Sequence, residues 1–296
     1  MYMNKFTYFS HTAALSAIFV MGSAVITLPV RGSNEFGFLA FMITGVLLVL
    51  VYWLFSVVFN KINVTESTKP VFKALYCAFI ISAGVFALFC LAETFLSLTE
   101  FVSKIILVQT SKFFIVSIFA AVIVVFALKS KESILKFSLL SFALISAVIV
   151  FFFIAPMDKY ELRNIYVFKF PRISEILTQM KPYLINPLSH SIILPIYLKL
   201  EWGKTKSKPS VLGVSIGCFL LGLCILSPIL LFGAGVSGEL QFPFNSAVST
   251  VTVGRLFTRL DGFSYFVYFV SALIKSCVLG RVAFKCLEES KGLLRN

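Results

Sequence analysis

The chain has 296 residues, of which 59% are hydrophobic and only 13% are charged, and its mean hydropathy is +0.96. Soluble domains contain about twice this share of charged residues, so the composition excludes a protein made mainly of soluble domains. The formal net charge is +13. Most of the lysines and arginines lie in short segments between apolar blocks, however, which indicates membrane topology and not nucleic-acid binding.

The apolar residues are grouped in blocks of about 20, the length that a bilayer core roughly 30 Å thick requires of a helix. We expect spans at about residues 12–30, 36–59, 72–98, 110–128, 134–156, 183–200, 210–236 and 262–282. The sequence therefore predicts an all-α polytopic bundle of about eight transmembrane helices, with residues 1–296 forming a single transmembrane domain.

The distribution of basic residues predicts the orientation of these spans. If the N-terminus is cytoplasmic, the cytoplasmic segments hold more Lys and Arg than the outside segments. Half of the outside charges lie in the long segment 157–182, and long segments count least for this rule. Both termini are therefore expected on the cytoplasmic side of an integral, multi-pass membrane protein.

The segment 157–182 is the longest polar stretch. Within it Ile173, Ile176, Leu177 and Met180 recur at helical spacing. This pattern is typical of a short amphipathic helix at a membrane surface, and an ordinary ordered loop is an equal alternative.

Two of the expected spans contain residues that interrupt helices. The first block holds Gly22, Ser23, Ala24 and Val25, followed by Pro29; these residues favour either a helix break with exposed backbone or close helix packing through small side chains. The sixth block contains a second interruption at 186–190 that includes Pro187, Ser189 and His190. Breaks in the first and sixth spans occupy corresponding positions of a five-plus-five inverted repeat, in which such breaks form a mid-membrane ligand site.

Ionisable residues inside apolar blocks are costly and therefore informative. Glu93 lies in the third block and Lys275 in the eighth. Each is expected either to face a polar cavity in the bundle or to extend its side chain to a membrane face. His190 is a third candidate, although a lone histidine at a helix end often has only a structural role.

The sequence contains no motif of a hydrolase, metalloprotease or nucleotide-binding enzyme, so no enzymatic activity is expected. The six cysteines form no Cys-x-x-Cys pair, and neither a metal site nor a cofactor is predicted. Arg259 and Asp261 precede the last block, where Asp261 is expected to cap the helix and to favour its dipole. This structural role is more probable than contact with a ligand.

The segment from Phe242 and Pro243 through Arg259, Leu260 and Asp261 to Lys275 resembles a stretch of the endospore germination permeases. These are the membrane-embedded B subunits of germinant receptors, in the amino acid–polyamine–organocation superfamily. The first span with Gly22, Ser23 and Pro29 and the second span are also similar to this family. Members usually have ten spans, so the resemblance implies a bundle that is short by two C-terminal spans, as a truncated or divergent paralogue would be.

The resemblance implies a germinant-receptor subunit of the cytoplasmic or inner spore membrane. Such a subunit would bind a small nutrient such as an amino acid and act together with other receptor subunits. The expected ligand-binding residues are Gly22, Ser23, Ala24, Val25, Ser189, His190, Glu93 and Lys275, with Pro29, Pro187, Arg259 and Asp261 in structural roles. Two alternatives are an amino-acid permease coupled to protons or sodium ions, and a structural subunit that has lost ligand binding.

Overall fold

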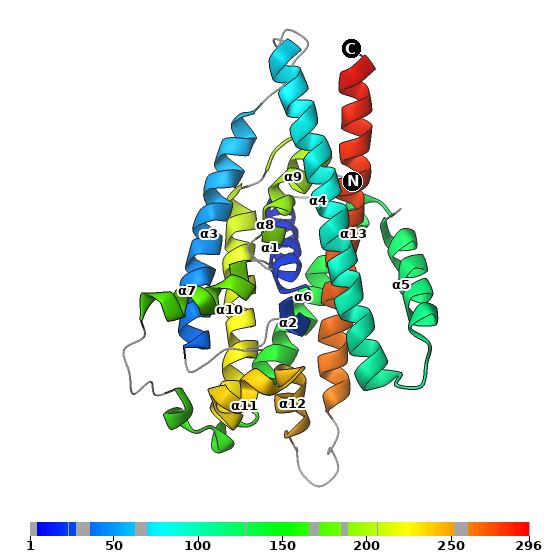
Figure 1. Ribbon diagram of the computed structural model, residues 1–296. Coiled ribbons are helices and arrows are strands. Elements are labelled where there is room, and N and C mark those ends of the chain that lie inside the picture. The colour runs from blue at the N-terminus through cyan, green and yellow to red at the C-terminus, as the bar shows by residue number, and fades with distance from the viewer. Residues whose placement is uncertain are drawn as a thin grey trace.

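A computed structural model describes residues 5–22, 24–27, 36–62, 70–127, 129–165, 172–184, 189–205, 207–251 and 260–295. Throughout these ranges the regular structure is helical, and no strand occurs in them (Figure 1). The helices are α1 (Lys5–Met21), α2 (Ala24–Thr27), α3 (Gly37–Lys61), α4 (Pro70–Phe101), α5 (Lys112–Ala127), α6 (Lys131–Ile154), α7 (Ile173–Tyr183), α8 (Ser189–Ser191), α9 (Ile193–Trp202), α10 (Ser207–Phe232), α11 (Ala234–Glu239), α12 (Pro243–Ser249) and α13 (Asp261–Arg295).

Within the described ranges, five segments are long and apolar enough to cross a membrane: Gly37–Lys61, Pro70–Ile106, Lys131–Lys159, Ser207–Phe232 and Asp261–Gly292. Two shorter apolar helices cover Tyr8–Met21 and Lys112–Phe126. Each of the seven overlaps a predicted block, and the block predicted at 183–200 falls largely on the short helices α8 and α9. The prediction of an all-α membrane helix bundle is therefore confirmed, while the number of eight spans stays a prediction.

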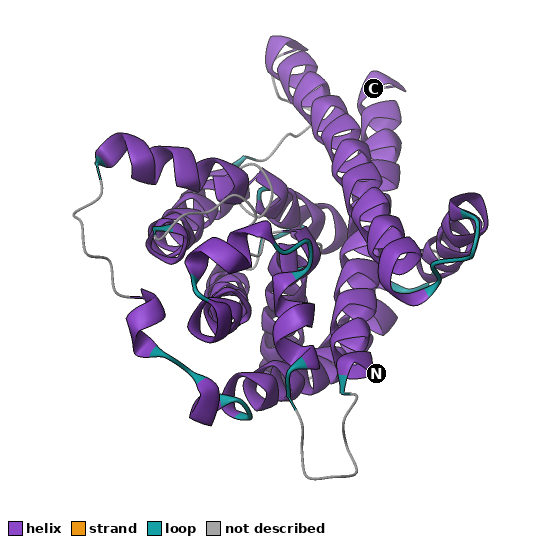
Figure 2. Cartoon of the chain, turned by 60° about the horizontal axis from the view of Figure 1, so that its bottom comes forward, coloured by secondary structure: helices purple, strands orange, loops and turns teal. Residues whose placement is uncertain are grey.

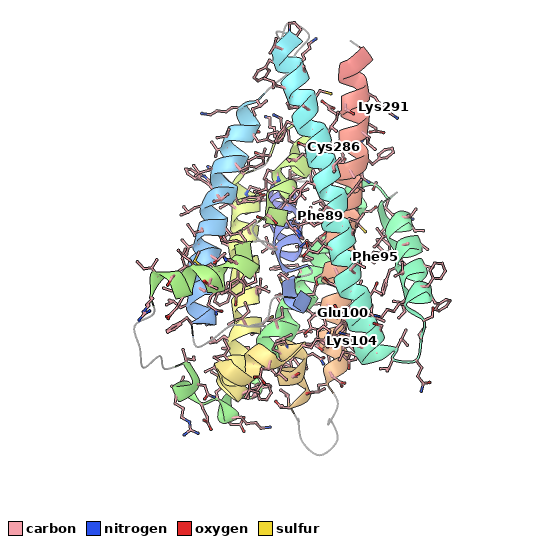
Figure 3. The ribbon with its side chains drawn as sticks, in the orientation of Figure 1. Phe89, Phe95, Glu100, Lys104, Cys286 and Lys291 are labelled. Atoms are coloured by element: carbon pink, nitrogen blue, oxygen red, sulfur yellow. The ribbon has the colours of Figure 1, made fainter. Side chains whose placement is uncertain are left out.

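The long helices differ in how much of their surface the bundle covers. In α10 and α13, 61% and 67% of the most apolar stretch is buried, whereas in α3 only 28% is buried. Helices α3 and α4 carry large exposed apolar side chains such as Phe89 (Figure 3). A helix that is apolar on all sides and only partly covered by protein presents its remaining surface to lipid, so α10 and α13 form the centre and α3 and α4 the periphery.

Glycine allows the closest helix contact in the centre, between α1 and α10. A Cβ atom added to Gly213 would lie 2.7 Å from Cβ of Ser16, and one added to Gly217 would lie 2.7 Å from the backbone oxygen of Ala17. Both distances are shorter than an ordinary van der Waals contact. The Gly-x-x-x-Gly spacing of α10 therefore lets the two backbones meet, as small residues commonly do where membrane helices associate.

Helix α7 lies crosswise to the long helices (Figure 1). It begins where the backbone N–H of Arg172 donates to Oε2 of Glu175 at 3.1 Å. Tyr183 packs against the ring of Phe41 on α3, with ring centroids 5.4 Å apart, whereas Ile173 is exposed. The alternative of an ordered loop is thus wrong for this part of 157–182, which forms the predicted short helix.

Candidate functional site

The first apolar block is interrupted where the sequence predicts a break. Helix α1 ends at Met21, the N–H of Gly22 donates to the oxygen of Ile18 at 2.7 Å, and a separate helix α2 begins at Ala24. Ala24 and Val25 are buried. Ser23 and Pro29 lie outside the described residues, so the break is described only by the residues around them.

Lys275 of α13 packs directly against this break. A Cβ atom on Gly22 would collide with Cδ of Lys275, and it would lie 3.1 Å from the Cβ of that lysine. Lys275 is fully buried, and its Nζ lies 5.8 Å from the ring centroid of Phe19. One turn earlier on α13, the hydroxyl of Ser271 donates to the oxygen of Gly22 at 3.3 Å. Gly22 is therefore the residue that makes room for a lysine inside the bundle.

A second pair of predicted residues meets beside this lysine. Nε2 of His190 on α8 lies 3.1 Å from Oε2 of Glu93 on α4. The His190 side chain is 2% exposed and the Glu93 side chain 31%. The Glu93 carboxylate thus points toward α8, and Lys275 lies close enough to both groups for their charges to interact.

We name Gly22, in the turn after α1, together with Glu93 of α4, His190 of α8 and Lys275 of α13, the central cluster. Each was a candidate from the sequence, and the structure brings them together although they are far apart in the chain. Ser189 immediately precedes His190 and is half-buried. Nδ1 of His190 has no hydrogen-bond partner among the residues that the structure describes. Pro187 lies outside the described residues.

Asp261 lies away from the central cluster, at the first position of α13. Its carboxylate accepts a hydrogen bond of 2.8 Å from the hydroxyl of Tyr265, and its backbone oxygen accepts one of 2.7 Å from Ser264. A carboxylate in the first helical turn is favourable to the helix dipole, so the geometry agrees with a structural role. Arg259 is outside the described residues.

A buried ion pair at the end of α9 was not predicted from the sequence. Nη2 and Nε of Arg281 lie 2.7 Å and 2.9 Å from Oε1 of Glu201, and the Glu201 side chain is only 4% exposed. Nζ of Lys131 donates to the backbone oxygen of Glu201 at 2.7 Å. Glu201 directly follows an apolar block, but a charged residue next to the end of a span is too common to predict burial.

Further hydrogen bonds connect this end of α9 to α3. Nζ of Lys199 donates to the backbone oxygens of Phe59, at 2.7 Å, and of Ile62. The backbone N–H of Thr205 donates to Oδ1 of Asn60 at 3.2 Å. The short α8–α9 segment is therefore held to α3, α6 and α13 at one end, while its other end places His190 against Glu93.

A groove of about 440 Å³ lies elsewhere, between α3 and α10, with an almost entirely apolar lining that includes Phe41, Gly45 and Phe219. Since both helices belong to the spanning set, this groove is a feature of the lipid-facing surface. It does not include the central cluster.

The structure defines a polytopic helical membrane protein with ionisable residues gathered at a helix break inside the bundle. The chain belongs to the spore germination protein family, whose match covers residues 8–289. This confirms the resemblance noted in the sequence. No curated protein and no solved structure matches the chain.

Proposed function

We propose that this protein is the membrane-embedded subunit of a germinant receptor and that it binds a small nutrient such as an amino acid at the central cluster. The observation that supports this proposal is the meeting of Lys275 with the Glu93–His190 pair at the break after α1. A lysine and a carboxylate at one place offer partners for both charged groups of a zwitterion. Broken membrane helices bind substrates in this way in transporters.

The proposed mechanism is a shift between two conformations and no covalent chemistry. A ligand shifts such an equilibrium only by binding one state more tightly than the other. Because α8–α9 connects His190 to Glu201 at the far end of α9, a change at the cluster would move that end against α3 and α13. Partner subunits of the receptor would respond to this motion. We further propose that this end, with both termini, is cytoplasmic, since its segments are rich in lysine and arginine.

The second candidate is an amino-acid permease, which the ionisable residues of the cluster also favour. A coupled transporter needs an interior group that changes its charge during the cycle, and Glu93, His190 and Lys275 are such groups. Uptake of labelled amino acids into vesicles, lost in Lys275→Ala, would support this candidate. Binding without uptake would support the function as a receptor subunit. If the protein neither binds nor transports an amino acid, the remaining alternative is a structural subunit that has lost ligand binding.

Thermal stabilisation of the purified protein by a panel of amino acids, sugars and nucleosides tests the proposed site. A stabilising amino acid should lose at least about tenfold in affinity in Lys275→Met, roughly 1.4 kcal/mol, because one charged partner is removed. Lys104→Met is the matched control, since Lys104 lies just beyond the lower end of α4 (Figure 3) and pairs with Glu100 at 2.6 Å. Unchanged affinity in Lys275→Met would place the ligand elsewhere.

Replacing Gly22 tests the same site through its shape. Gly22→Leu should abolish the stabilising effect of the ligand, because a side chain there must displace Lys275. Gly262→Leu is a suitable control, since a Cβ atom at Gly262 meets nothing within 4 Å. If the ligand still stabilises Gly22→Leu as it does the wild type, the proposed placement is wrong.

A further inference from the structure

A second cavity, of about 280 Å³, lies between α5, α6 and α13. Its walls are mainly apolar and include Phe126, Phe137, Leu273 and Ile274, and its polar lining includes Lys129 and Ser133. An apolar space with a cation and a hydroxyl among its lining residues matches an amphiphilic molecule better than a fully polar one.

The position of this cavity brings it next to the bilayer. Figures 1 and 2 place α5 at the outer edge of the bundle, and α5 exposes apolar side chains such as Phe113 and Val125. Phe126 belongs to the last turn of α5 and Ser133 to the first turn of α6. The Lys129 end of the cavity therefore lies where α5 ends and α6 begins, and membrane helices commonly end near the level at which hydrocarbon gives way to lipid headgroups.

The charge around the lysine is mainly positive. Lys129 is exposed and forms no ion pair with any residue in the described ranges. Lys131 and Lys136 follow on α6, and the N-terminus of this 24-residue helix adds a partial positive charge. Of the nearby acids, Glu132 is exposed, and Glu201 is already paired with Arg281.

We propose that this cavity binds an anionic phospholipid, with an acyl chain against Phe126, Phe137, Leu273 and Ile274 and the headgroup phosphate at Lys129 and Ser133. Basic pockets between membrane helices bind anionic headgroups through such a combination. The apolar walls favour a lipid over free phosphate, which would leave them empty, and the charge favours an anionic over a zwitterionic headgroup. The proposal is independent of the nutrient site.

The test is native mass spectrometry of the purified protein released from nanodiscs of equal phosphatidylglycerol and phosphatidylcholine. We expect retained phosphatidylglycerol to exceed phosphatidylcholine, and Lys129→Gln to lower its retention about fivefold, the effect of one basic residue at a membrane surface. Lys291→Gln is the matched control, because it removes the same charge from an exposed site near the C-terminal end of α13 (Figure 3) and should change retention little.

Two further measurements separate the alternatives. Leu273→Trp should lower the retention of phosphatidylglycerol, because the larger side chain fills the cavity while Lys129 stays in place. Thermal melting of this variant in detergent shows whether it is folded. Inorganic phosphate should not stabilise the protein. Equal retention of both lipids, equal losses in Lys129→Gln and Lys291→Gln, or stabilisation by phosphate alone would each overturn the proposal.

Discussion

Replacing Glu201 with alanine is expected to lower the free energy of unfolding by about 3–5 kcal/mol, the usual cost of removing one partner of a buried ion pair. The substitution leaves the guanidinium of Arg281, whose side chain is 15% exposed, without its carboxylate. Chemical denaturation of the protein in detergent micelles, followed by circular dichroism, measures the change. Glu288→Ala is the control, because Glu288 forms an exposed pair with Lys285 and should cost about 0–1 kcal/mol.

The double variant Glu201→Leu with Arg281→Met shows whether the unpaired charge causes this loss. Buried ion pairs replaced by apolar residues of similar size are often neutral in stability, so the double variant should recover most of what Glu201→Ala loses. A double variant as unstable as Glu201→Ala would show that the hydrogen bond from Arg281 to the oxygen of Lys129, or local packing, matters more than the pair.

The second large effect is expected at the contact between α1 and α10. Gly217→Leu should destabilise the protein by about 3 kcal/mol or more, at the upper end of overpacking costs, because the new side chain meets the backbone of Ala17. A backbone cannot move aside as a flexible side chain does. Loss of the monodisperse peak in size-exclusion chromatography and a lower melting temperature measure the effect.

Gly45→Leu supplies the comparison for this prediction. Gly45 also lies in a spanning helix, but it lines the groove between α3 and α10. The atom nearest to a Cβ added at Gly45 is Cβ of Cys218, 3.9 Å away. Leucine should therefore fit there with little loss of stability. Equal destabilisation by both variants would mean that glycine matters at these sites for a reason other than the close approach of α1.

Hydrophobicity alone was enough to predict the bundle, because lipid requires long apolar helices whose backbone groups are paired internally. The ends of these helices were harder to predict. The last helix was expected to end at about residue 282, yet α13 continues to Arg295. Charged residues of the tail, such as Lys285 and Glu288, pair along one helix face and are compatible with a helix that extends beyond the bilayer.

The residues of the central cluster were predictable because each was unusual where it stood. Gly22 interrupts an apolar run, and Glu93 and Lys275 are charges within such runs. Their meeting was not predictable, since it depends on how α4, α8 and α13 pack. Glu201 and Arg281 were missed for the opposite reason, because charged residues next to the ends of spans are common, and their burial follows only from the three-dimensional arrangement.

Trp202 gives the end of α9 an optical signal of its own. Its ring packs edge-on against the rings of Tyr8 and Tyr197, with ring centroids 6.0 Å and 5.6 Å apart. Nζ of Lys131 lies 5.5 Å from the centroid of the Trp202 ring. The chain has only two tryptophans, and the other, Trp53, is 48% exposed on α3. A Trp53→Phe protein would therefore hold a single tryptophan, at the Glu201–Arg281 junction, so that tryptophan emission reports the movement of α9 without any added label.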